Sequence, residues 1–192
     1  MSLAVLSDQE IVAALADGEL VVSPFDADMV RPAALSVRLG AGAFVLRADA
    51  PVDIADAATH PRLHPREPDE QGRLRLDPGE VMLAPTLERV ALGRHLAGLV
   101  DGTSDYARLG ISVVLCHQVS PGFGTPNGAI LTLEIVSRLA QPVYLRPGTR
   151  IGNLMLLRCA GARRPYPEMP ANYSDDTAVR ASRLAEQVGV RS

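Results

Sequence analysis

A glutamate stands within a strongly apolar run near the middle of this sequence. Glu134 lies in residues 130–136, where every other residue except Thr132 is apolar. A carboxylate in such a run is costly to bury without polar partners, and a partly buried carboxyl group is suited to proton transfer. The alternation of a strand could also place Glu134 on a solvent-facing side, so both interpretations stay open at this point. Glu134 is therefore the first candidate for an acid/base residue.

A hydroxyl and a guanidinium follow an Asp-Gly turn upstream of this run. Ser104 and Arg108 come shortly after Asp101-Gly102. A serine hydroxyl can position water, and an arginine supplies fixed donors where negative charge develops during a reaction. Taken alone, a serine and an arginine in a loop usually form a cap or a surface ion pair. Only the surrounding motif favours a functional role for Ser104 and Arg108.

Two histidine-containing segments invite a metal interpretation. Cys116 and His117 are adjacent, yet zinc-dependent deaminases carry a His-x-Glu and a Pro-Cys-x-x-Cys segment, and neither occurs here. Neighbouring strand residues also point to opposite faces, which disfavours a catalytic Cys–His pair. His60 and His64 have the spacing of helical zinc ligands but lie in a Pro-rich loop with no third ligand in view. We therefore predict no metal site.

Short apolar runs separated by turn residues indicate an all-β fold. They occupy residues 20–22, 35–39, 43–46, 81–84, 89–92, 96–100, 111–115, 130–136, 143–145 and 151–157. Many short strands with few helices are typical of a β-sandwich or barrel. Asn127-Gly128 predicts a hairpin that returns along residues 130–136, and Pro147-Gly148 predicts a type II turn.

Helices are expected only near the two ends of the chain. Ser7 to Glu10 has the capping-box pattern, so a helix within residues 1–19 should begin there and end near Gly18. The C-terminal segment, residues 161–192, permits a helix over residues 177–188. Residues 48–75 are rich in Pro, Asp, His and Arg without sustained periodicity, which predicts a long surface excursion. With no convincing boundary, we expect a single domain over residues 1–192.

The composition restricts the kinds of molecule that the protein can bind. The chain has 192 residues, of which 47% are hydrophobic, enough for a sizeable core. Its net charge of -3 argues against binding a nucleic acid polymer, which requires a clustered basic face. Cys116 and Cys159 provide no disulfide framework, and the first twenty residues lack a secretory pattern. We expect a cytoplasmic protein without a membrane segment.

Several motifs, taken in order, resemble the dCTP deaminase branch of the dUTPase-like superfamily. That family carries a Gly-Arg-Ser-Ser-x-x-Arg-Leu-Gly motif, a His-x-x-Asp-Pro-Gly turn and a strand with a catalytic glutamate. The corresponding residues here are 102–110, 117–122 and Leu133-Glu134, within a similarity that extends from Leu6 to about Tyr166. The resemblance implies a dUTPase-like distorted β-barrel or jelly roll with a short N-terminal helix and a C-terminal helical segment.

The resemblance also implies a role for each residue of a site. Glu134 would be the general acid/base, and Ser104 with the backbone carbonyl of Cys116 would hold the attacking water. Arg108 would stabilise charge and hold Glu134 in place. The residues expected to bind the nucleotide are Thr103, Asp105, Ser120 and Tyr166.

These roles imply metal-independent hydrolytic deamination of a cytosine (deoxy)nucleotide, which gives the uracil nucleotide and ammonia. Deamination would require no cofactor, although Mg²⁺ could accompany a bound nucleotide triphosphate. A homotrimer is implied because members of the family build each pocket between neighbouring subunits. The alternatives are a dUTP diphosphatase and a nucleotide-binding homologue without catalysis.

Six positions depart from the family pattern. An arginine, a lysine, a second serine, a glutamine and two aspartates are replaced by Thr103, Asn172, Asp105, Asp176, Ser36 and Ser120, respectively. Losing two charge-assisted contacts of about 1.5–3 kcal/mol each would weaken triphosphate binding by a factor on the order of a hundred to several thousand. The lost cations favour the binding-only alternative, whereas the replaced aspartates count against the diphosphatase.

Overall fold

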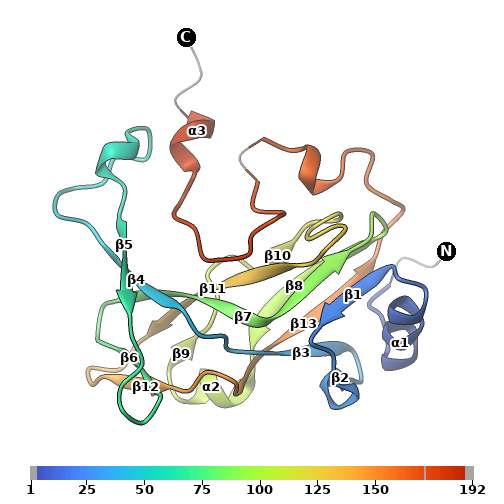
Figure 1. Ribbon diagram of the computed structural model, residues 1–192, viewed down its shortest axis with the longest axis horizontal. Helices are drawn as coiled ribbons and strands as arrows, with labels where there is room; N and C mark the ends of the chain where they lie inside the picture. The colour runs from blue at the N-terminus through green and yellow to red at the C-terminus, as the bar shows by residue number, and fades with distance from the viewer. Residues whose placement is uncertain (1–3, 171, 189–192) are drawn as a thin grey trace.

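The computed structural model describes residues 4–170 and 172–188, and strands make up most of its regular structure (Figure 1). The larger sheet has the order β5-β4-β7-β11-β9, with β1 paired to β7, and the smaller sheet has the order β10-β8-β13-β3-β2. Strands β12 and β6 form a separate pair. In chain order the strands are β1 (Leu20–Ser23), β2 (Val30–Arg31), β3 (Ala34–Arg38), β4 (Ala43–Arg47), β5 (Arg62–Arg66), β6 (Leu74–Leu76), β7 (Val81–Leu92), β8 (Leu96–Gly102), β9 (Ile111–Ser112), β10 (Gln118–Val119), β11 (Ala129–Ser137), β12 (Val143–Leu145) and β13 (Arg150–Arg158).

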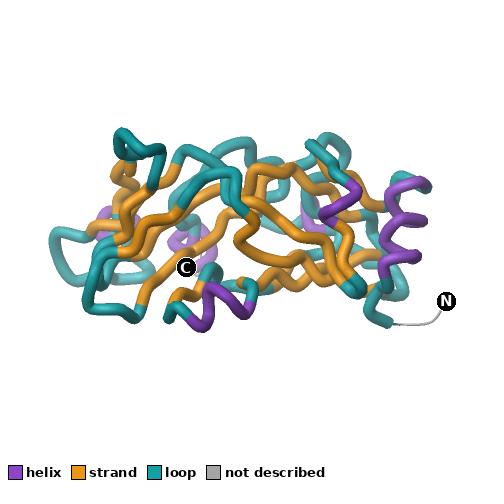
Figure 2. The backbone as a smooth tube through the Cα atoms, turned by 90° about the horizontal axis from the view of Figure 1, so that it is seen from below, coloured by secondary structure: helices purple, strands orange, loops and turns teal. Residues whose placement is uncertain are grey.

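The main hydrophobic core lies between the larger sheet and the smaller sheet. Met82 and Leu133 contribute to it from the larger sheet, and Val37, Val100 and Leu154 contribute from the smaller one. Apolar residues at every second position of these strands reach the core, as the period of a strand requires. Figure 2 shows strands along the length of the molecule, with helix α1 (Asp8–Ala16) at one end. The all-β prediction is confirmed.

The helices are short, and α1 contributes Ile11 and Ala14 to the main core. In α1 the Glu10 carboxylate accepts hydrogen bonds from the Ser7 N–H at 2.8 Å and from the Ser7 hydroxyl at 2.9 Å, as the capping-box pattern predicted. The remaining helices are α2 (Ser104–Arg108), α3 (Leu184–Val188) and the 3₁₀ turns η1 (Ala27–Met29), η2 (Ala57–Thr59) and η3 (Tyr166–Glu168). None of the helices in the described part of the chain has the length and apolar character of a membrane span.

One long strand replaces two that the sequence indicated. Residues 81–84 and 89–92 both belong to β7, which pairs with β1, β4 and β11. Pro85 interrupts the hydrogen bonding of this strand because proline has no N–H, and the pairing with β11 shifts register beside it. The Thr86 hydroxyl accepts the Leu131 N–H at 3.0 Å, so a side chain replaces a backbone acceptor at the irregularity.

The excursion over residues 48–75 is mostly exposed, but it also contains strands that the sequence did not indicate. Strand β5 pairs with β4 at the edge of the larger sheet, where Leu63 lies opposite Leu46. Strand β6 pairs with β12. An edge strand needs only one neighbour and little apolar alternation, which explains why periodicity missed β5.

The two turn predictions had different outcomes. Thr149 N–H donates to the Arg146 carbonyl at 3.3 Å, and Gly148 has a φ of 83°, so Pro147-Gly148 forms the predicted turn between β12 and β13. The hairpin predicted at Asn127-Gly128 is wrong. Strand β10 before this turn belongs to the smaller sheet, whereas β11 after it belongs to the larger one.

Candidate functional site

A cavity of about 590 Å³ lies beside β11, β10 and the C-terminal segment. Its volume falls in the range that holds small organic ligands. Apolar side chains from both large sheets form one part of the wall. Polar side chains come from β11, from residues 116–120 and from residues 166–182, so segments far apart in the sequence meet here.

Glu134 belongs to this wall. On β11 the neighbouring Leu133 and Ile135 are buried in the main core, and alternation turns Glu134 to the opposite face, where it is half-buried. Its Oε2 atom accepts hydrogen bonds from the N–H groups of Leu115 at 3.0 Å and Cys116 at 3.3 Å. The carboxylate therefore borders a cavity and is held in place by two backbone donors.

Cys116 and His117 have separate surroundings. Cys116 lines the cavity and meets Glu134 through its backbone N–H. The Nδ1 atom of His117 lies 2.8 Å from the Val100 carbonyl oxygen, which ties residues 113–117 to β8. His117 thus has a structural contact, and the water-holding role of the Cys116 carbonyl stays a prediction.

Two residues predicted to bind nucleotide also reach the cavity. Ser120 and Tyr166 both line it. The Tyr166 ring stacks on Phe123 with a centroid separation of 6.2 Å, and its hydroxyl accepts the Tyr173 N–H at 3.1 Å. Burial raises the pKa of the Tyr166 phenol, so this hydroxyl stays neutral and able to hydrogen-bond at ordinary pH.

The C-terminal residues 172–183 form the roof of the cavity, a name kept here for that segment. Backbone hydrogen bonds from Gly124 N–H to the Ser174 carbonyl and from Ile130 N–H to the Asp176 carbonyl, both 3.0 Å long, attach it beside β11. Val179 packs with Leu83 and Ile130 on the outer face of the larger sheet. The roof therefore covers the same face from which Glu134 projects.

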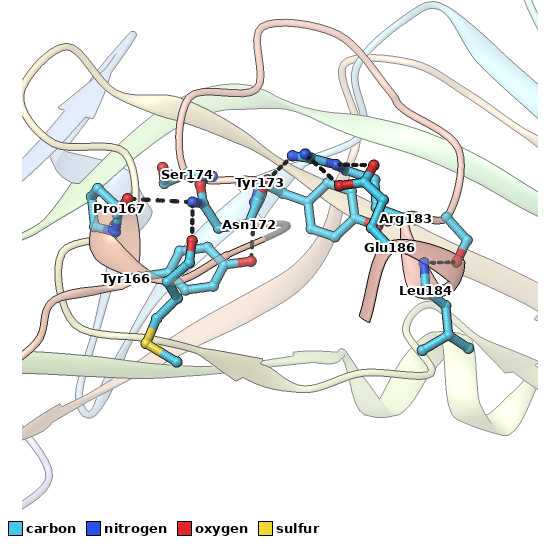
Figure 3. Close-up of polar contacts among 10 residues, drawn as sticks. Tyr166, Pro167, Asn172, Tyr173, Ser174, Arg183, Leu184 and Glu186 are labelled. Atoms are coloured by element: carbon cyan, nitrogen blue, oxygen red, sulfur yellow. Dashed lines mark hydrogen bonds and ion pairs between the residues drawn. The ribbon is translucent and has the colours of Figure 1, made fainter. Parts of the chain in front are cut away.

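Arg183 fastens the end of the roof (Figure 3). Its guanidinium donates to the Asn172 carbonyl at 2.9 Å and to the Glu186 carboxylate at 2.8 and 2.9 Å. Its backbone N–H donates to the Tyr173 hydroxyl at 2.8 Å. These bonds fold the segment back on itself, so the roof is an ordered part of the cavity wall.

Asp176 is the most deeply buried acid of the roof. It is 2% exposed and lines the cavity. Its Oδ1 atom forms an ion pair with Arg180 Nε at 2.9 Å. This contact lacks hydrogen-bond geometry, and Oδ1 accepts no hydrogen bond from any described residue. Burial raises the pKa of the Asp176 carboxyl, and Arg180 opposes that rise. Sequence reasoning identified Asp176 as a departure, but it did not place Tyr173, Arg180 or Ser182 at the site.

Helix α2 carries the other predicted residues and lies away from this cavity. Ser104 and Arg108 are exposed on it, and in Figure 1 it lies at the bottom of the view, whereas the roof lies in the upper half. Thr103 is buried at its N-cap, and Asp105 lines a second hollow of about 350 Å³ near Tyr144. A single chain therefore does not bring these residues to Glu134.

Two further observations concern metal and phosphate chemistry. Within the described ranges, no group of three or more His, Cys, Asp or Glu side chains could hold a metal ion.

Ser36, which replaces an aspartate of the family pattern, is buried. Its hydroxyl accepts a hydrogen bond from Arg31 Nε at 2.9 Å and donates to Asn153 Oδ1 at 3.2 Å. Ser36 is not among the residues that line the cavity.

Comparison with known proteins gives a consistent picture. The family model described as dCTP deaminase-like matches residues 5–159. A protein of Halobacterium salinarum named "dCTP deaminase, dUMP-forming" is 34% identical over 94% of this chain and 94% of its own length. A protein of Acidothermus cellulolyticus with the same name is 38% identical over 84% of each chain.

A solved structure supports the fold. The 2'-deoxycytidine 5'-triphosphate deaminase of Agrobacterium tumefaciens aligns with a TM-score of 0.60 at 22% identity, over 83% of this chain and 49% of that one. At this identity the likeness concerns the fold alone. Because the family match covers most of the sequence and the relatives extend over most of both chains, this chain belongs to the dCTP deaminase-like family.

Proposed function

We propose that the protein hydrolyses the exocyclic amino group of a cytosine nucleotide, giving the uracil nucleotide and ammonia. The observation that carries this proposal is the Glu134 carboxylate, held by two backbone N–H groups at the wall of a ligand-sized cavity. Family membership and relatives named dCTP deaminase support cytosine as the base.

Glu134 carries the proton in this mechanism. The carboxylate takes a proton from a water molecule, and the resulting hydroxide attacks C4 of the cytosine ring. The attack makes C4 tetrahedral, and the protonated carboxyl delivers its proton to ring N3, where the electron pair of the C4–N3 double bond goes. A second transfer, from the new hydroxyl through Glu134 to the amino group, lets ammonia leave and restores the C4 carbonyl. General acid/base transfer of this kind contributes roughly 10²–10⁴-fold to the rate.

Ser104 and Arg108 would act on the Glu134 of a neighbouring copy. Both are exposed on α2, beside Leu109, which is 61% exposed, and Leu115 next to Cys116 is 59% exposed. Contact between copies would cover both apolar side chains and would bring a hydroxyl and a guanidinium to the cavity. A head-to-tail contact that closes into a ring fits the homotrimer implied by the family resemblance.

Deamination in this proposal requires no cofactor, and Mg²⁺ would accompany only a triphosphate substrate. Two other functions remain testable. A dUTP diphosphatase would release pyrophosphate, and the "dUMP-forming" relatives raise the same question for dCTP. A binding protein without catalysis is favoured by the acids at positions 105 and 176, which oppose a triphosphate.

A substrate panel tests these functions. The purified protein is incubated with dCTP, dCMP, CTP, deoxycytidine and dUTP, with and without Mg²⁺, while ammonia and pyrophosphate are measured separately. Ammonia from a cytosine substrate supports the proposal, and ammonia together with pyrophosphate from dCTP indicates both activities. Pyrophosphate from dUTP alone supports the diphosphatase. Inert substrates that still raise the melting temperature would support the binding protein.

A further inference from the structure

The charge of the cavity wall is unusual for a triphosphate site. Of the described residues that line it, Glu134 and Asp176 are acidic and only Arg180 is basic. Arg180 is already engaged, with its Nε 2.9 Å from Asp176 and its Nη2 3.6 Å from Asp175. Phosphate groups are recognised chiefly by arginine and lysine donors, because these contacts combine charge with hydrogen bonds. The described residues of one chain supply no unengaged cation for them, and the Arg108 that a neighbouring copy would bring is assigned to Glu134 rather than to a phosphate.

Asp176 has the features of a ligand-recognising carboxylate. It is 2% exposed, borders the cavity, and its Oδ1 accepts no hydrogen bond from the described residues. Arg180 Nε lies 2.9 Å from this Oδ1 atom but makes no hydrogen bond to it, so a hydrogen-bond donor of a ligand can still satisfy the buried atom. The carbonyl of the same residue accepts the Ile130 N–H, so the backbone that carries the carboxylate is held beside β11 without a ligand.

We infer that Asp176 sets the specificity of the site, favouring a cytosine nucleoside or nucleoside monophosphate over the triphosphate. Its carboxylate accepts a hydrogen bond from an uncharged donor of the substrate, such as a sugar hydroxyl, and repels additional phosphate groups. This inference rests on the proposed cytosine specificity and concerns only the substituent at the 5′ position.

The test compares two ratios in wild type and in Asp176→Asn. One is kcat/KM for dCTP divided by kcat/KM for dCMP, from ammonia release at a fixed Mg²⁺ concentration. The other is the corresponding ratio of dissociation constants from calorimetry. Wild type should prefer dCMP on both measures, and Asp176→Asn should shift both ratios toward dCTP by about tenfold or more, since like charges in contact cost several kcal/mol.

Asp175→Asn is the matched control. It removes the same charge from the neighbouring residue, whose side chain is 80% exposed and does not line the cavity. Its ratios should equal those of wild type, and melting curves of both variants confirm that they fold. Tighter binding of dCTP than dCMP by wild type, or weaker dCTP binding by Asp176→Asn, would overturn the inference. Absence of ammonia from every substrate would overturn the proposed function instead, and the calorimetric ratio would still decide the inference.

Discussion

The residues assigned to chemistry lie in two regions of the molecule, the cavity beside β11 and helix α2. Within one chain, only the residues beside β11 face a cavity. Beside β11, the Glu134 carboxylate has two backbone donors, a cavity and an attached roof. On α2, Ser104 and Arg108 are exposed on a five-residue helix, away from that cavity. Preorganised donors require a fixed position relative to the reacting atoms, which an exposed side chain lacks until something packs against it.

In the proposed shared site, the α2 residues would reach the cavity from a neighbouring copy. A carboxylate that is positioned within its own chain can be recognised in a single copy. Donors that face outward become functional only when another surface meets them, and a second copy offers the cavity edge at Leu115 and Cys116.

The largest effect is expected at Glu134. Glu134→Gln keeps the shape and the hydrogen-bond acceptor facing Leu115 but removes the proton carrier, so kcat should fall by roughly 10²–10⁴-fold. Ammonia release under saturating substrate measures this loss. Glu168→Gln, at an exposed position outside the cavity, is the control and should keep wild-type activity. A fall of less than tenfold at Glu134 would remove it from the mechanism.

Arg108→Ala should reduce kcat/KM by roughly 10²-fold, in the range for removal of one charge-stabilising donor. The melting temperature of the single chain should hardly change, because the side chain is exposed. Steady-state kinetics measures kcat/KM, and calorimetry measures the melting temperature. Arg138→Ala removes an equally exposed guanidinium and should be neutral. Full activity in Arg108→Ala would leave α2 without a catalytic role.

The sequence predicted those parts of the site whose signals are local. Alternation over residues 130–136 and the Ser7 capping pattern correspond directly to β11 and α1. Helix α2 was missed because five residues give no apolar period, although Gly110, which follows the C-cap Leu109, has the positive φ of 73° typical of a helix end. A motif can thus point to candidate residues while periodicity fails to identify the element that carries them.

The features that the sequence could not predict depend on contacts between segments far apart in the chain. Gly128 has a φ of 81°, so the turn chemistry at Asn127-Gly128 is right, yet the strands on either side join different sheets. Asp176 and Arg180 reach the cavity because backbone bonds at Gly124 and Ile130 attach the roof. No local pattern encodes such contacts, since they depend on which surfaces meet after folding.

A smaller effect is expected from loosening the roof. Val179→Ala removes methyl groups packed on Leu83 and Ile130, which should weaken attachment by about 1–2 kcal/mol. KM should then rise roughly tenfold while kcat changes less, because Glu134 keeps its own donors. Val12→Ala, on the exposed side of α1, is the control. An unchanged KM would show that substrate binding does not require the attached roof.

The smallest effect concerns pH. Burial raises the pKa of the Asp176 carboxyl above its ordinary value of 3.8. The folded protein therefore binds this proton more tightly than the unfolded chain, so its contribution to stability is complete below about pH 3.9 and is lost as the pH rises through the folded pKa. The melting temperature of Asp176→Asn minus that of wild type should grow, by about a few degrees, between pH 4 and pH 7. A constant difference would contradict the direction of the shift.

The division of the site between copies is tested most directly by mixing two inactive variants. Glu134→Gln and Arg108→Ala are co-expressed with different tags, and assemblies that carry both tags are assayed for ammonia release. If one copy supplies Glu134 and its neighbour supplies Arg108, every homotrimer that carries both tags regains one intact site, so roughly a third of the wild-type activity should return. Activity no higher than that of either variant alone would contradict a shared site and would return Arg108 to the surface of its own chain.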